Sequence, residues 1–345
     1  MAVINQKTLT IAAVMSLAGC QSSAGIEKDR PQSTSHESQS VYEIQFASAK
    51  RFSDAMRQLH DDSVQYCSAN RSLEQVKATW RQGMESWMHL QGQERGPATA
   101  LEQNWNIQFW PDKKNTTGRK MVAATKIDSW DMASVQSQSV TVQGLGSVEW
   151  LLYDTASTIS VGGTKECSLL AAVTESLVDR SNTIVEAWRI NPWPELDTKA
   201  WHAEYLAMLS NQLDYSMKKL SRPLAKIGSP RPYFSESWRS NSSLLNLKEN
   251  IIAMQSLYLA QGEGLDDILR AAGEAALADN IVHQFEDTLE TWPEESSLFE
   301  MLQTKEGYRT VLAQFNKLEQ LKYLINEEAS IKLGVVIGFN ATDGD

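Results

Sequence analysis

The sequence is short of glycine and proline. It holds 18 glycines and 9 prolines in 345 residues, whereas the two together make up about 12% of an average chain. Because these residues most often interrupt helices, their scarcity favours long helices. A hydrophobic fraction of 42% is enough for a sizeable core and excludes a chain that is disordered throughout.

Positive charge is also scarce. The chain has 43 acidic residues against 32 lysines and arginines, a net charge of −11, and no basic run longer than a pair such as Lys113 and Lys114. A surface of this charge repels the phosphate backbone of nucleic acids. We therefore predict no nucleic-acid partner.

Several motifs of catalysis and cofactor binding are missing. The sequence has no H-E-x-x-H, no C-x-x-C, no G-x-S-x-G and no glycine-rich phosphate loop, and without C-x-x-C-H it has no c-type haem attachment site. His283 lies three residues before Glu286, and His202 lies two before Glu204. Such pairs arise by chance among so many acidic residues, so we expect them on the surface rather than at a metal site.

The first 20 residues have the pattern of a bacterial lipoprotein signal. Lys7 supplies positive charge, residues 9–17 form an apolar stretch too short to span a bilayer, and the segment closes with Leu-Ala-Gly-Cys, which looks like a lipobox. We expect a signal peptide over residues 1–19 and a lipid on Cys20 that anchors the chain on the periplasmic side of a membrane. Gln21 in place of aspartate favours the outer membrane if the host is Gram-negative. The alternative is an ordinary secreted protein in which Cys20 has no such role.

Cys67 and Cys167 are the other two cysteines. In an exported, oxidising compartment they form a candidate disulfide. The sequence leaves open two buried free thiols instead, because it does not show whether the two Cα atoms come within bonding reach.

The remainder of the chain predicts an all-α fold. Residues 20–40 are rich in serine and glutamine without apolar periodicity, which predicts a flexible tether. From Val41 onward, apolar residues recur at spacings of three and four, as the buried face of a bundle helix requires. Typical stripes are Val76, Trp80, Met84 and Trp87, then Leu206, Leu209, Leu213, Met217 and Leu220, then Leu244, Leu247, Ile251, Met254 and Tyr258.

Clusters of glycine, proline and asparagine mark the predicted breaks between helices. Such clusters lie at residues 96–97, 110–112, 144–146, 191–194 and 228–232, among others. The cluster at 191–194 lies near the middle of the mature chain. We place a boundary there, between a first helical bundle over residues 41–195 and a second over residues 196–345.

Four segments of the chain resemble the imelysin-like proteins, exported bacterial proteins associated with iron acquisition. They are Asn106 to Asn115, Gly144 to Leu152, Glu236 to Ser240, and Gly338 to Asp345. The resemblance implies two antiparallel helical bundles packed side by side with a cleft between them. This arrangement agrees with the boundary inferred above.

The best-known motif of that family is Gly-x-His-x-x-Glu, and this chain departs from it. Gly144 and Glu149 match, but Gly146 stands at the histidine position. A zinc peptidase needs at least three protein ligands and an open position for water. With glycine at position 146, the imidazole that would serve as one of these ligands is missing. The departure argues against the peptidase activity ascribed to some relatives.

The resemblance implies a polar cleft site, which we expect to lack a complete zinc coordination set. Its predicted members are Gly144, Glu149, Trp150, Arg239, Asn340 and Asp343. In this site Glu149 either faces the cleft as a functional carboxylate or pairs with Arg239 and joins the two bundles. Asn340, Asp343 and Asp345 offer oxygen ligands for a hard cation, although an acidic chain end is more often solvated.

Three functions follow from these expectations. The first is a non-catalytic binding protein of iron uptake or handling, the second is a zinc metallopeptidase, and the third is a scaffold in an envelope transport complex. No cofactor is predicted, and iron or another divalent cation remains the candidate ligand. The expected partners are the membrane, through Cys20, and iron-transport or envelope proteins.

Overall fold

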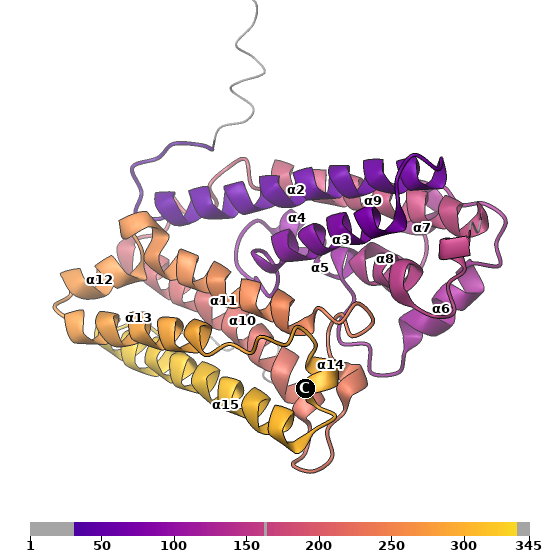
Figure 1. Ribbon diagram of the computed structural model, residues 1–345. Helices are drawn as coiled ribbons and strands as arrows, with labels where there is room; N and C mark the ends of the chain where they lie inside the picture. Colours follow the sequence, from indigo (N-terminus) through magenta and orange to yellow (C-terminus); the bar gives the residue numbers. More distant parts are fainter. Residues whose placement is uncertain (1–30, 162–163, 337–345) are drawn as a thin grey trace, which may run out of the picture. The chain divides into compact units, whose positions relative to one another are not determined.

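The computed structural model describes residues 31–161 and 164–336, and within these ranges every regular element is a helix (Figure 1). This confirms the predicted all-α fold. Cys20, Asn340, Asp343 and Asp345 lie outside the described residues. No helix in the described ranges is long and apolar enough to cross a membrane. The helices up to residue 187 are α2 (Gln39–Cys67), α3 (Leu73–Met88), α4 (Ala98–Leu101), α5 (Asn104–Ile107), α6 (Thr116–Ala124), α7 (Met132–Gln136), α8 (Gly144–Tyr153) and α9 (Thr164–Ala187).

The remaining helices lie after residue 195. They are α10 (Thr198–Leu224), α11 (Ser243–Leu259), α12 (Leu265–Ala271), α13 (Ala275–Glu290), α14 (Leu298–Met301), α15 (Lys305–Lys322) and α16 (Ser330–Leu333). A π-helical stretch, η5 (Tyr323–Ala329), joins α15 to α16. Short 3₁₀ turns lie at η1 (Val140–Val142), η2 (Ile159–Val161), η3 (Pro232–Phe234) and η4 (Ala260–Gly262).

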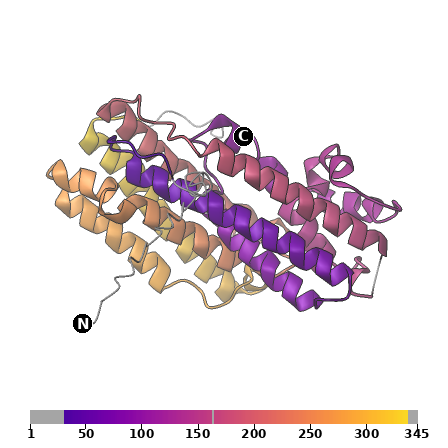
Figure 2. The same ribbon diagram turned by 90° about the horizontal axis from the view of Figure 1, so that it is seen from above.

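The helices of the first half pack around α2. Figures 1 and 2 show α2 and α9 side by side along their lengths, although they are far apart in the sequence, and α3 also packs on α2. Phe52, Met56 and Leu59 of α2 are fully buried, as are Val76 and Trp80 of α3. The apolar stripes seen in the sequence therefore do form the core in this half.

The second half packs around α10. This helix contacts α11 and α15, and α13 contacts both of those helices. The predicted stripe of α11 is buried at every position, from Leu244 to Tyr258. In the stripe of α10, Met217 is half-buried at the edge of the core and the other members are buried.

Contacts between α3 and α11 join the two halves. The compact unit already begins at Gln32, within the segment predicted to be a tether. There, His36 Nε2 lies 2.9 Å from the carbonyl oxygen of Leu196, and Asn191 Nδ2 donates to Ser38 Oγ at 3.0 Å. The division into domains at residue 195 stays a prediction.

Local signals fix where two of the helices begin. Ser72 and Gln75 form the reciprocal capping box that their spacing indicates at the start of α3. Gly144 has a φ of +76°, and a side chain there would meet the carbonyl oxygens of Ile107 and Asn106 at 2.3 and 2.6 Å. The break predicted over residues 144–146 is wrong in extent, because α8 starts at Gly144 and contains Gly146.

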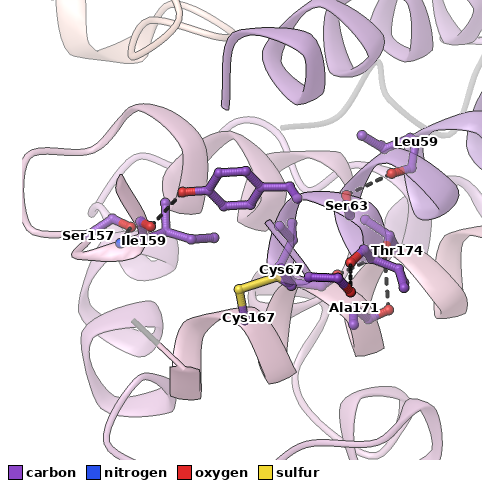
Figure 3. Close-up of a disulfide and its surroundings, with 12 residues drawn as sticks. Leu59, Ser63, Cys67, Ser157, Ile159, Cys167, Ala171 and Thr174 are labelled. Atoms are coloured by element: carbon purple, nitrogen blue, oxygen red, sulfur yellow. Dashed lines mark hydrogen bonds between the residues drawn. A yellow bond between two sulfur atoms is a disulfide. The ribbon is translucent and has the colours of Figure 1, made fainter. Parts of the chain in front are cut away.

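The predicted disulfide is present. Cys67 ends α2, Cys167 lies in the first turn of α9, and their Cα atoms are 5.6 Å apart (Figure 3). Tyr66, which precedes Cys67, is fixed by a hydrogen bond, because its hydroxyl donates to the carbonyl oxygen of Ile159 at 2.7 Å. The bridge thus fastens the end of α2 to the start of its main packing partner.

A buried ion pair of the second half is joined to the first half by hydrogen bonds with Gln91 and Gln108. Lys219 of α10 and Glu236 have side chains 2% and 1% exposed, and Nζ lies 2.5 Å from the carboxylate. Gln91, which follows α3, donates to Glu236 at 2.5 Å and accepts from Lys219 at 3.0 Å. Gln108 donates to the same carboxylate at 3.0 Å, and Asn250 of α11 accepts from Lys219 at 2.6 Å. Burial lowers the pKa of Lys219, and the neighbouring carboxylate opposes that effect.

Lys219→Met should destabilise the protein by about 3–5 kcal/mol, because it leaves the Glu236 carboxylate buried without its counter-charge. Urea denaturation followed by circular dichroism measures the change. The matched control is Lys165→Met, which breaks the exposed ion pair with Asp128 and should cost less than about 1 kcal/mol. Equal effects of the two substitutions would show that the buried pair has no special role.

Candidate functional site

A cavity of about 450 Å³ lies beside Glu149. We call it the Glu149 pocket. Its walls come from the loop between α5 and α6, from α8, and from the segment between α10 and α11. Three of the four segments that carry the family resemblance therefore meet here, and the residues that line the pocket include Gln108, Asp112, Lys113, Lys114, Asn115, Gly146, Glu149, Tyr233, Glu236, Trp238 and Arg239.

Glu149 is a buried carboxylate that receives hydrogen bonds on one oxygen. Oε1 accepts from the backbone N–H and from the hydroxyl of Ser240, both at 2.9 Å. Among the described residues, Oε2 has no hydrogen-bond partner, which leaves that oxygen for a ligand. Burial raises the pKa of Glu149, and the positive charge of Arg239 and the two bonds from Ser240 lower it in part.

Arg239 is held by residues other than Glu149. Its Nε donates to Asp154 at 2.6 Å, its Nη2 donates to Asn115 at 2.9 Å, and its guanidinium lies 4.3 Å from the centre of the Trp238 ring. The expected alternative, a direct ion pair between Glu149 and Arg239, is therefore wrong: Arg239 pairs with the aspartate that follows α8. Its charge still acts on Glu149 through space.

The other predicted cleft residues have different places. Gly144 lies outside the pocket lining and allows the close approach of α8 to residues 106–107. Trp150 is 1% exposed and packs in the core. The structure thus brings together Glu149 and Arg239, while Gly144 and Trp150 support the helix that carries Glu149.

Gly146 leaves room where the family motif has its histidine. A Cβ atom built at this position would meet no atom within 4 Å, and the residue is one helical turn from Glu149 on α8. A side chain could therefore start at this position without a clash, and no histidine is among the described residues that line the pocket.

The donor set around Glu149 does not fit a catalytic zinc ion. Among the described residues, no group of three His, Cys, Asp or Glu side chains could hold a metal. The nearby carboxylates also have other partners: Glu236 pairs with Lys219, and Asp112 accepts from the backbone N–H groups of Thr116 and Thr117 at 2.7 and 2.8 Å. A zinc site needs three protein ligands, and the described residues of this pocket supply one free carboxylate oxygen.

The two His–acid pairs of the sequence do not contribute to the pocket. His283 lies 3.3 Å from Glu286 with a side chain 77% exposed. His202 lies near Glu37, at 3.5 Å, and not near Glu204, which bonds with Arg95 and Trp193. His283 lies on the surface, as expected, whereas His202 is mostly buried, with a side chain 15% exposed.

Sequence reasoning missed Gln108, Asp112 and Glu236 as parts of the site. All three fall in segments that carry the family resemblance. Polar residues beside Trp110 and Trp238 within those segments were the available signal, because a buried polar group needs a partner. Their partners come from distant segments and could not be read from spacing.

Glu149→Gln should leave the protein at least as stable as the wild type at pH 7. The carboxyl has a raised pKa in the folded state, so the folded protein binds this proton more tightly than the unfolded chain. Its ionisation therefore removes stability as the pH rises from about 4.3, the ordinary value for glutamate, through the folded-state pKa. Urea denaturation at pH 4 and pH 7 measures this, with the exposed Glu319→Gln as control. A variant much less stable than wild type at pH 7 alone would contradict the assignment.

Comparisons with known proteins agree with this fold. A crystal structure of an imelysin-like protein from Psychrobacter arcticum 273-4 has a TM-score of 0.69 at 17% identity, over 92% of this chain and 99% of that one. A putative iron-regulated protein A precursor from Parabacteroides distasonis ATCC 8503 has a TM-score of 0.67 at 15% identity, over 87% of this chain and 96% of that one. No curated protein matches the sequence significantly. The model of the family described as Imelysin, peptidase M75, matches residues 46–325, and the chain therefore belongs to the imelysin family.

Proposed function

We propose that this protein is an exported, lipid-anchored imelysin-family protein that takes part in iron uptake or handling as a binding component without catalysing a reaction. The observation that carries the proposal is the Glu149 pocket. There, segments from both halves of the chain surround one buried carboxylate with a free oxygen. A cavity of about this size is typical of a binding site, and the polar and charged side chains that line it favour a polar ligand.

The metallopeptidase alternative lacks support in this chain. Peptide hydrolysis by zinc depends on three protein ligands that lower the pKa of the bound water. Gly146 replaces the histidine of the motif, and the neighbouring carboxylates are engaged in a helix cap and in ion pairs. The pocket can hold a ligand by hydrogen bonding and charge, but it cannot activate water in that way.

The link to iron rests on the family and on one structural relative. That relative bears the name iron-regulated protein A precursor. We infer a similar context for this chain, with iron, free or in a complex, as cargo. Iron-transport or envelope proteins are the corresponding partners.

A complementation experiment tests the role in iron handling. A host strain without this protein should accumulate less iron and grow more slowly in iron-poor medium, and the wild-type chain should restore both. Glu149→Gln should fail to restore them although it folds, whereas the exposed Glu319→Gln should succeed. Iron content is measured by mass spectrometry of washed cells.

Two results would contradict the proposal. One is normal iron accumulation in the strain that lacks the protein. The other is zinc-dependent proteolysis by the purified chain that disappears in Glu149→Gln, which would restore the peptidase assignment.

Anchoring is proposed from the lipobox that ends at Cys20. A cysteine that carries a diacylglycerol and one further acyl chain binds membranes far more strongly than a single lipid chain does, because each buried CH₂ contributes about 0.8 kcal/mol. Cys20→Ser should therefore release the protein into the soluble fraction or stop its processing, as seen by fractionation and immunoblotting. Unchanged membrane association of a processed Cys20→Ser chain would refute the anchor.

A further inference from the structure

A second cavity, of about 540 Å³, shares one wall with the Glu149 pocket. Residues 108–110 and 112–114 line both cavities, and the opposite wall of the second is the α10 face with Tyr215, Lys218 and Arg222. We call it the Tyr215 pocket. The proposed function does not use the residues of α10 that line it.

Unpaired positive charge gathers in this pocket. Within the described part of the chain, Lys113, Lys114, Lys218 and Arg222 form no ion pair with a carboxylate. The lining contains two acidic residues. Asp112 accepts hydrogen bonds from backbone N–H groups at the start of α6, and Glu94 is exposed to solvent. A local excess of cations in a chain of net charge −11 creates a site that attracts anions.

Aromatic rings form the apolar walls. Trp105 is 55% exposed, and its ring centre lies 5.8 Å from that of Phe109. On the other side, the Trp110 ring lies 5.6 Å from Tyr215, with the Arg222 guanidinium 6.0 Å from its centre. Such rings stack well on another flat ring, and an exposed tryptophan at a cavity is typical of a ligand contact.

Two polar groups in the pocket have no partner. Nε of Arg222 is buried without a hydrogen bond, and within the described residues the Tyr215 hydroxyl has none either. Burial raises the pKa of Tyr215, so its hydroxyl keeps its proton and can donate it. A buried donor without an acceptor is costly, so a bound acceptor would stabilise the Arg222 Nε, and the Tyr215 hydroxyl could donate to the same group.

We infer that the Tyr215 pocket binds a flat aromatic anion of the aryl carboxylate class. Its ring lies against Trp105, Phe109 and Trp110. Its acidic group faces Lys218 and Arg222 and accepts a hydrogen bond from Tyr215. This assignment is separate from the iron role proposed for the Glu149 pocket and does not depend on it.

A matched pair of probes tests the assignment. 2-Naphthoate and its neutral analogue 2-naphthamide have the same ring, so titration of the mature chain with each, followed by tryptophan fluorescence and calorimetry, isolates the contribution of the charge. We expect naphthoate to bind about tenfold or more tightly than the amide, with an affinity that falls as salt is added.

Variants locate the binding site. Lys218→Gln and Arg222→Gln should each weaken naphthoate binding about fivefold to tenfold and leave naphthamide nearly unchanged. Tyr215→Phe should weaken naphthoate binding severalfold, and Trp105→Ala should weaken both probes. The exposed Lys305→Gln and the neighbouring-pocket variant Glu149→Gln should not alter either affinity.

Four results would overturn the assignment. The first three are no binding of naphthoate at millimolar concentration, equal affinities for the acid and the amide, and unchanged naphthoate affinity in both Lys218→Gln and Arg222→Gln. The fourth is loss of naphthoate binding in Glu149→Gln, which would place the ligand in the Glu149 pocket.

Discussion

The fold depends on one charged pair that is almost completely removed from water. Lys219 and Glu236 lie side by side in the interior, and both ions would be costly there if they were unpaired. Gln91 contacts both charges, and Gln108 and Asn250 satisfy the remaining groups. Lys219 and Glu236 both belong to the second half, whereas Gln91 and Gln108 belong to the first, so docking of the two halves completes the hydrogen bonds of the pair.

The same network shapes the functional surfaces. Glu236 and Gln108 line the Glu149 pocket while their polar atoms stay engaged in the interior. The carboxylate of Asp112 is likewise engaged, at the start of α6. As a result, Glu149 is the carboxylate in this pocket that keeps an oxygen without a partner among the described residues. The segment from Gln108 to Lys114 then separates this site from the cationic, aromatic cavity on α10.

The sequence predicted the features that depend on local pattern. Apolar spacing predicted the helices, and two cysteines in an exported chain predicted the disulfide. It could not predict that Arg239 pairs with Asp154, at the end of α8, instead of Glu149, in the middle of that helix, because tertiary geometry decides between the two acids. The Lys219–Glu236 pair was missed for the same reason: a lysine within an apolar stripe reads as solvated unless its distant partner is known.

The most direct test of this account is a double-mutant cycle on Lys219 and Glu236, read from the free energy of unfolding. Lys219→Met and Glu236→Gln should each destabilise the protein strongly, and the double variant should be more stable than the sum of the two effects predicts by about 2 kcal/mol or more. Effects that simply add would show that the two charges do not depend on one another. The buried pair would then not be the coupled element on which the surrounding hydrogen bonds of Gln91 and Gln108 depend.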